Sequence, residues 1–256
     1  MADPIVTLGE ASSHWYDANG QPCHTVLDNK GQPRATTLRD ARKLGLVPSV
    51  TTIMQCANKP GLNRWREEQV LLAALTLPRN TGEPEREWVR RVVEDSRETA
   101  RKAAERGTAI HAAVEQAYRW DTGYGYTEHV AGVMAAVEQL TGLLPAAMTP
   151  ERTFARQGYG GTVDLSAPGW VLDVKTKEFT FSDPRPQLWD EHCMQLAAYA
   201  FGLDMAARCA IVFVSSTEPG LVVMQELTTE QRGRGLEMFS ALKAYWQAAN
   251  NYYPGA

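Results

Sequence analysis

Residues 161–177 read GTVDLSAPGWVLDVKTK, which is two short apolar runs joined by a turn-forming segment. Within 166–169, Pro168 cannot donate a hydrogen bond to a strand ladder, and Gly169 tolerates a positive φ. The flanking runs alternate between apolar and polar residues with a period of two, apart from Val171. This stretch therefore predicts a β-hairpin on which the fold is built.

The expected register of this hairpin follows from the length of its turn. If 166–169 form a four-residue loop, Leu165 lies opposite Trp170, and Thr162 lies opposite Asp173. A bulge in either strand would reverse which side chains share a face.

Without a bulge, one face of the hairpin is polar. Asp164 and Asp173 lie diagonally on it, roughly 7–8 Å apart at the backbone, and Lys175 joins them two residues further on. Two carboxylates at this separation can converge on a divalent cation beside a phosphodiester. The alternative is an ordinary surface hairpin whose charges point to water. The other face is expected to join the core and consists of Val163, Leu165, Trp170, Leu172 and Val174.

The composition fits one large domain, or a core with an added subdomain. The chain has 256 residues, of which 44% are hydrophobic, so it can bury a sizeable core. No run approaches the ~20 apolar residues that span a bilayer, and the first six residues lack the features of a signal peptide. We therefore expect a cytoplasmic protein with no membrane partner.

Net charge and cysteine content limit the classes of function and the kinds of metal site that the chain can have. A net charge of -4 argues against coating nucleic acid by bulk charge, but metal-binding carboxylates would add to the acidic count of a nuclease. The four cysteines are scattered without CxxC spacing, so neither a zinc site nor an iron–sulfur cluster is expected. Free thiols in a reducing compartment are the default.

The order of predicted elements gives the fold class. The pattern predicts helices at 62–77, 85–118, 128–140, 188–201 and 229–249, and strands at 151–156, 163–165, 170–175, 209–215 and 221–227. A short helix capped by Thr37 or Asp40 ends near Gly45, and Ser49 or Thr51 caps another. This order predicts a layered α/β or α+β domain.

The long helix at 85–118 carries many charges of both signs, which favours a solvated helix with internal salt bridges. Gly107 is expected to be a break or a point of close packing. We expect residues 1–100 to form an N-terminal extension and 101–256 the core, with the extension forming an arch or channel for DNA. Its aromatic residues Trp15, Tyr16, Trp65 and Trp88 could stack on bases or fill the core.

Two helical pairs supply further polar groups. His111 and Glu115 are four residues apart on one helix face, and Gln195 and Tyr199 repeat that spacing. His192 lies on the same face as Gln195. Each pair, taken alone, is equally compatible with a structural role.

Together, these features resemble the PD-(D/E)XK nuclease superfamily, and more closely its RecB-type exonuclease branch, which includes phage exonucleases and mitochondrial genome maintenance exonucleases. The motifs are the Gly-x-x-x-His helix 107–111, the Gly-x-x-Asp strand 161–164, Asp173-Val174-Lys175, the Gln-x-x-x-Tyr helix 195–199, and 48–52 with a later Trp65-Arg66. The resemblance covers roughly residues 45–200. It implies a restriction-endonuclease-like core, with a central mixed sheet flanked by helices.

The resemblance also implies site roles. His111, Asp164, Asp173 and the Val174 carbonyl would bind Mg²⁺ or Mn²⁺, Glu115 would hold a second ion through water, and Glu151 would lie in the outer shell. The implied catalytic residues are Asp164, Asp173, Lys175, Gln195 and Tyr199, and the implied substrate-binding residues are Ser49, Thr51, Trp65, Arg66 and Tyr199. Several relatives hold an iron–sulfur cluster with three cysteines near the C-terminus. Nothing after Cys209 could supply them here.

The implied function is a metal-dependent DNA exonuclease that acts on strand ends in recombination, repair or replication. DNA, as single strands or duplex ends, is the implied partner, together with a recombination or single-strand-binding protein, and a monomer is expected. Three alternatives stay open: a site-specific endonuclease or nickase, a catalytically inactive nucleic-acid-binding protein, and a two-carboxylate carbohydrate or small-molecule enzyme. The last leaves Lys175 and His111 without roles.

Overall fold

The computed structural model describes residues 13–58 and 60–255, so the N-terminal segment used to judge a signal peptide lies outside the described residues. The helices are α1 (Leu38–Leu44), α2 (Val50–Met54), α3 (Pro60–Thr76), α4 (Glu85–Tyr118), α5 (Thr127–Thr141), α6 (Asp190–Gly202) and α7 (Thr229–Asn250), with a 3₁₀ turn η1 (Pro145–Ala147). The strands are β1 (Trp15–Tyr16), β2 (Thr25–Leu27), β3 (Pro33–Ala35), β4 (Val47–Pro48), β5 (Thr149–Arg156), β6 (Tyr159–Ala167), β7 (Trp170–Lys177), β8 (Arg208–Ser215) and β9 (Val222–Glu226). The predicted helices and strands are confirmed within a few residues at each end.

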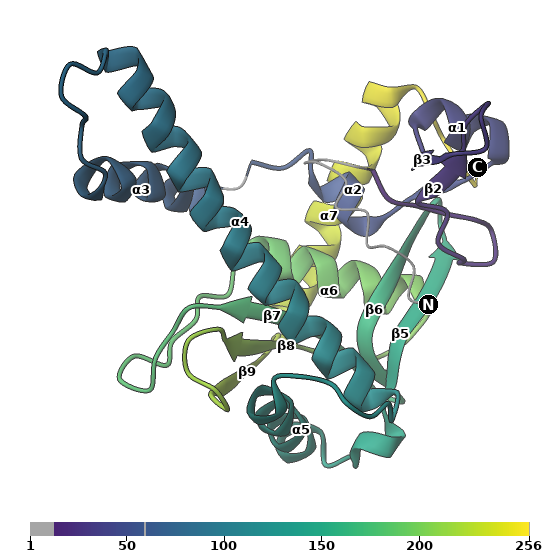
Figure 1. Cartoon of the computed structure of the whole chain (residues 1–256). Coiled ribbons are helices and arrows are strands. Elements are labelled where there is room, and N and C mark those ends of the chain that lie inside the picture. The colour runs from purple at the N-terminus through teal and green to yellow at the C-terminus, as the bar shows by residue number, and fades with distance from the viewer. Residues whose placement is uncertain (1–12, 59, 256) are drawn as a thin grey trace.

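A five-stranded mixed sheet forms the centre of the molecule (Figure 1). Its order is β5-β6-β7-β8-β9, in which β7 and β8 are parallel and the other neighbours are antiparallel. Helices α6 and α7 pack on one side, and α4 and α5 pack on the other. The layered α/β class predicted from the sequence is therefore confirmed. Among the described residues, no helix is both long and apolar enough to cross a membrane.

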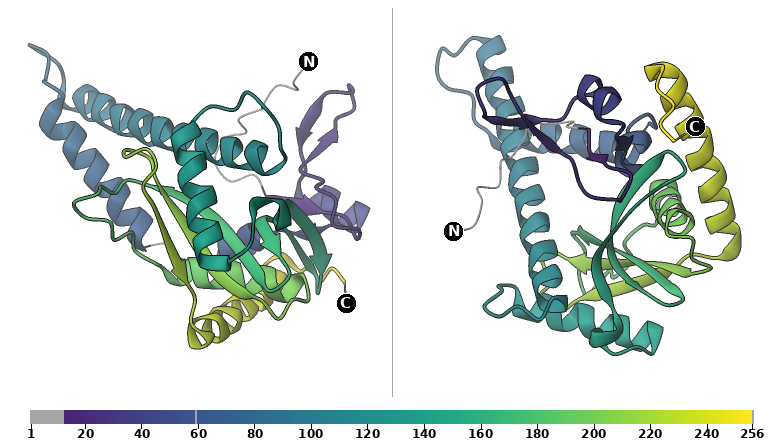
Figure 2. Two further views of the ribbon diagram at one scale, coloured as in Figure 1. Left: turned by 90° about the horizontal axis from the view of Figure 1, so that it is seen from below. Right: turned by 90° about the vertical axis from the view of Figure 1, so that its right-hand side faces the viewer.

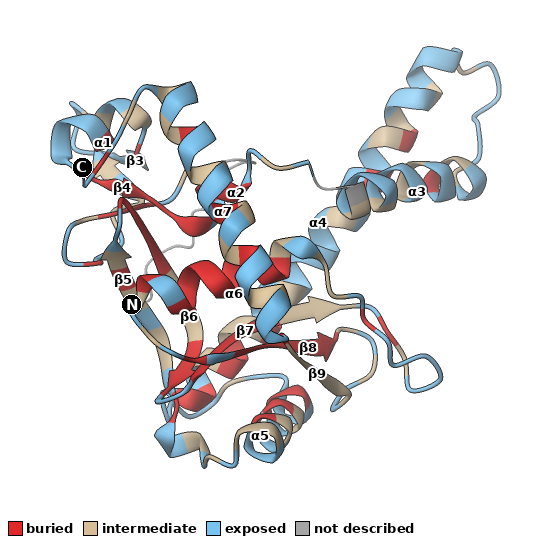
Figure 3. Cartoon of the chain, turned by 180° about the vertical axis from the view of Figure 1, so that it is seen from behind, coloured by how far each residue is buried: buried red, intermediate tan, exposed pale blue. Residues whose placement is uncertain are grey.

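The two faces of the sheet hold separate hydrophobic clusters. On the α6 side, Val171, Ile211 and Phe213 pack with α6 and α7 side chains and with the buried Trp15. On the α4 and α5 side, Leu172 and other strand residues pack with helix residues that include Val114 and Val133. Burial concentrates in the sheet and α6 (Figure 3).

The hairpin register differs from the prediction by two residues. Ala167 pairs with Trp170 and Leu165 with Leu172, so the turn is only Pro168 and Gly169, whose φ is 83°. The predicted four-residue loop, and the pairing of Thr162 with Asp173, are therefore wrong. The two central residues suffice because proline suits the first position of a turn and glycine accepts the positive φ of the second.

The β6–β7 ladder ends at the Leu165 and Leu172 pair. Leu165 packs on the α4 and α5 side, as expected, but Val163 packs on the α6 side. The predicted core face is therefore wrong for Val163. The strands part just where Asp164 lies, and this opening creates the candidate site.

Helix α3 and the N-terminal half of α4 form an arm that projects from the sheet (Figure 2). Its surface carries ion pairs, including Arg91–Glu83 at 2.6 Å and Arg101–Glu98 at 2.7 Å, which confirms the salt-bridged character predicted for 85–118. Helix α4 runs through residue 100 and does not break at Gly107. Instead, Gly107 packs closely on the sheet, where its carbonyl accepts a hydrogen bond from Thr176 Oγ1 at 3.4 Å.

Gly235 lets α7 approach α6 very closely, which gives a test of the packing. A Cβ at Gly235 would lie 2.5 Å from the Cys193 carbonyl oxygen, whereas a Cβ at Gly233 on the same helix meets nothing within 4 Å. Overpacking against backbone typically costs about 1–3 kcal/mol, and glycine-to-alanine exchange inside an open helix gains roughly 0.5–1 kcal/mol. We expect Gly235→Ala to lower the urea midpoint of unfolding and Gly233→Ala to raise it slightly. Equal midpoints for the two variants would refute this packing.

Candidate metal centre

Strand β7 places Asp173 and Lys175 on the same face, as predicted. Asp173 is only 1% exposed, and its Oδ2 lies 2.6 Å from the Nζ of Lys175. The Lys175 side chain retains 31% exposure, so its ammonium group can reach solvent or a ligand. A buried carboxylate thus sits beside a cation at the end of the opened hairpin.

Helix α6 supports the other oxygen of Asp173. The amide Nε2 of Gln195 donates to Asp173 Oδ1 at 2.8 Å and to the Tyr199 hydroxyl at 3.0 Å. Gly161 makes room for this group, because a Cβ there would lie 2.8 Å from Cε1 of Tyr199.

Asp164 enters the site from β6 at the point where the strands separate. Its Oδ2 accepts a hydrogen bond from the backbone N–H of Val174 at 2.7 Å, so the carboxylate takes the place of a ladder partner. The same oxygen lies 3.1 Å from His111 Nε2 on α4. Residues from β6, β7 and α4 therefore meet here.

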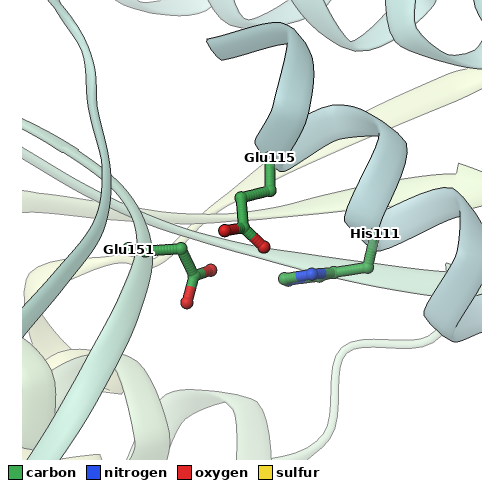
Figure 4. A group of neighbouring side chains, drawn as sticks. All are labelled: His111, Glu115 and Glu151. Carbon is green, nitrogen blue, oxygen red and sulfur yellow. The ribbon is translucent and has the colours of Figure 1, made fainter. Parts of the chain in front are cut away.

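A second group of ligand atoms lies beside Asp164. One ligand atom each from His111, Glu115 and Glu151 lies within 4.8 Å of the other two, a spacing that could hold a metal ion. Figure 4 shows the three side chains pointing toward one another from α4 and β5. The same residues line a small pocket with Asp164 and Val174. The resemblance implied only an outer-shell role for Glu151, since nothing in the sequence pattern indicates that β5 lies across from α4.

The carboxylates of the site lie close together, and this shifts the pKa values of the groups around them. The hydrogen bond with Asp164 raises the pKa of His111 to about 9, against the effect of burial. Burial raises the pKa of Glu151 to about 7, and the charges of Asp164 and Glu115 add to this. Burial also raises the pKa of Asp173 to about 6, although Lys175 opposes the shift. Burial alone would raise the pKa of Asp164, but the hydrogen bond and charge of His111, together with Lys175, lower it.

The donor set fits a divalent cation. Asp173 Oδ2 is buried, and its partner among the described residues is the Lys175 ammonium at 2.6 Å, so the second lone pair of this oxygen is available to a metal ion. Carboxylate oxygens suit Mg²⁺ and Mn²⁺, and an imidazole nitrogen favours Mn²⁺ more than Mg²⁺. Buried carboxylates at this density are stable in the ionised form only with a nearby positive charge.

The contacts of the other residues singled out in the sequence are with neighbouring residues or with solvent. Ser49 is buried and accepts a hydrogen bond from the Thr52 amide as the N-cap of α2, while Thr51 and Arg66 are exposed. His192 is buried against Phe213, and its Nδ1 accepts from the Trp189 amide at 3.1 Å. His192 therefore helps to stabilise the N-terminal end of α6.

The aromatic residues of the N-terminal region have different roles. Trp15 and Tyr16 are 1% and 4% exposed, so of the two roles that the sequence allowed them, they fill the core. The Tyr16 hydroxyl lies 2.8 Å from Thr162 Oγ1, two residues before Asp164, and so connects the N-terminal strand to β6. No sequence signal predicts this contact across 146 residues. Trp88 packs in the arm and donates to the Leu77 carbonyl, whereas Trp65 lines a cleft.

No family model and no curated protein matches this chain. Two of the solved structures that match illustrate a low level of similarity. An alkaline exonuclease (LHK-Exo) from Laribacter hongkongensis is 16% identical, with a TM-score of 0.35 over 49% of this chain and 68% of the other. A protein designated SSO0001 is also 16% identical, with a TM-score of 0.25 over 44% of this chain and 56% of the other. Both similarities are too distant to support a conclusion about fold or function.

Proposed function

We propose that this protein is a metal-dependent DNA exonuclease that hydrolyses phosphodiester bonds at strand ends. The observation that carries the proposal is the convergence of Asp164, Asp173 and Lys175, in which the buried Asp173 Oδ2 lies 2.6 Å from the Lys175 ammonium. The sequence resemblance to RecB-type nucleases assigns the same three residues to catalysis. Phosphodiester hydrolysis itself does not require the α3–α4 arm. The presence of the arm therefore supports a protein that acts on DNA passing beside the core.

The proposed metal ligands are Asp164, Asp173, the Val174 carbonyl and His111, with Glu115 and Glu151 available to the same or a second ion. A divalent cation in this position supplies charge that polarises a phosphodiester and makes water a better nucleophile.

The remaining residues hold and orient the reacting groups. Lys175 keeps its proton because Asp173 and Asp164 raise its pKa despite burial, so its ammonium group can stabilise negative charge that develops on the phosphate. Gln195 fixes the orientation of Asp173 through their hydrogen bond. Tyr199, whose pKa burial raises well above its ordinary value, stays protonated and supports Gln195.

Digestion of end-labelled DNA tests the proposal. We expect single- or double-stranded linear DNA to be shortened from an end with Mg²⁺ or Mn²⁺, and left intact with EDTA. A circular single strand separates the exonuclease from an endonuclease or nickase, because it offers no end. Cleavage of the circle would replace the exonuclease proposal with the endonuclease, and hydrolysis in EDTA would exclude the metal-dependent mechanism.

A further inference from the structure

A large cleft lies next to the candidate metal centre, and none of its residues belongs to that centre. Its volume is ≈ 1010 Å³, which is at the upper end for ligand sites in proteins. Strand β7 leads directly into it, since Thr176 and Lys177 line the cleft immediately after Lys175. A polymer held at Lys175 would therefore extend into this space on one side.

Two tryptophans form walls of the cleft from different elements. Trp65 comes from α3, and Trp189 precedes α6. A Cβ at Gly61 would lie 3.1 Å from Cζ2 of Trp189, so this indole packs against α3 one turn before Trp65. Both indoles are half-buried and therefore retain surface that a ligand can cover. The other large apolar lining residues are Met54, Leu62, Leu188 and Met194.

The charges around the cleft limit what it can hold. Glu178 and Glu191 line it, while Asp190 is paired with Arg234 at 3.0 Å. Positive charge comes from Lys177 and from Arg106, whose Nη1 lies 3.4 Å from the Ser216 carbonyl at the rim. A groove that followed phosphates along its whole length would be more basic. This mixture of charges suits a ligand that places flat apolar groups within the cleft and only a few phosphates at its rim.

We propose that this cleft binds the unpaired bases of single-stranded DNA, stacked on Trp65 and Trp189, with phosphates near Lys177 and Arg106. Bases within a duplex present their faces to neighbouring base pairs, so only an unpaired strand can cover an indole in this way. The inference rests on the proposed function for the identity of the polymer, and it deepens that function by assigning a single strand as the substrate beside Lys175.

The test measures binding without hydrolysis. The probe is an oligothymidylate of about twelve nucleotides in EDTA, and the readouts are its affinity and the quenching of tryptophan fluorescence. We expect Trp65→Leu and Trp189→Leu each to weaken binding about tenfold, the effect of losing one stacked base. Trp189→Phe should keep most of the affinity, because phenylalanine retains an aromatic face. Tyr245→Leu is the control, because Tyr245 is 62% exposed on α7 and lies outside the cleft.

Unchanged oligothymidylate binding in folded Trp65→Leu and Trp189→Leu would overturn the inference, as would equal affinity of the native chain for a duplex hairpin. If Trp189→Leu fails to fold, Trp65→Leu decides the question. The inference and the proposed function can fail separately. Metal-dependent digestion with unaltered binding in both variants would reject the cleft alone. Binding that depends on the tryptophans, in a protein that digests no DNA with either metal, would reject the nuclease alone.

Discussion

Replacement of Asp173 by asparagine is expected to lower DNA hydrolysis by about a thousandfold or more, because asparagine removes a charged metal ligand at the reacting centre. The side chain is nearly isosteric and can still accept the hydrogen bond from Gln195, so the geometry of α6 and β7 should persist. Calorimetric titration with Mn²⁺ should show weaker binding to the variant. Full metal-dependent activity in Asp173→Asn would reject the proposed site.

The same substitution should not unfold the protein. The pKa of Asp173 is raised to about 6 from its ordinary value of 3.8, mainly by burial. A carboxyl group with a raised pKa destabilises the folded state above that pH, and this cost disappears as the pH falls through both values. In EDTA at pH 8, the Asp173→Asn variant should therefore unfold at a denaturant concentration no lower than that of the native chain.

A matched asparagine control separates chemistry from a general effect of charge. Asp204 is 75% exposed and forms an ion pair with Arg156, away from the metal centre. We expect Asp204→Asn to keep its hydrolytic rate and its affinity for Mn²⁺. Equal losses in the two variants would mean that the activity does not depend on the Asp173 site.

Replacement of Lys175 by methionine is expected to lower hydrolysis by about a hundredfold to a thousandfold while the metal still binds. Methionine fills a similar volume but supplies no charge to the phosphate in the transition state. Arginine should rescue little, because its planar guanidinium group does not fit the position of an ammonium group 2.6 Å from Asp173 Oδ2.

The affinity for Mn²⁺ distinguishes the Lys175→Met variant from the Asp173→Asn variant. Asp173→Asn should weaken both Mn²⁺ binding and hydrolysis, whereas Lys175→Met should weaken hydrolysis alone. Lys30→Met, in an exposed turn, is the control and should match the native chain in both measurements. Loss of Mn²⁺ binding in Lys175→Met would show that Lys175 organises the ligands and has no separate role in the reaction.

Much of the site could be predicted from local sequence. The alternation of residues in 161–177 and the four-residue spacings in α4 and α6 each fix which side chains share a face. A register error of two residues does not by itself exchange the two faces, because strand side chains repeat with a period of two, and the predicted faces of β7 are therefore correct. Asp173, Lys175 and Gln195 are therefore found together, as expected.

The remaining features depend on contacts that no local pattern encodes. The opening between β6 and β7 moves Val163 to the α6 side and lets Asp164 bind the Val174 amide. The proximity of Glu151 to His111 requires β5 to lie across from α4, and the cleft requires Trp65 and Trp189 to line the same space. Such arrangements arise from tertiary packing, which outweighs local preference.

The unbroken course of α4 restricts how this protein can change in length. Its 34 residues extend about 50 Å, from the end of the arm to the pocket that contains Glu115. Each residue advances a helix by about 100°, so inserting one residue before Gly107 would turn the arm by that angle relative to His111. Seven inserted residues, about two turns, would restore the direction. Related chains with longer or shorter arms should therefore differ by whole helical turns.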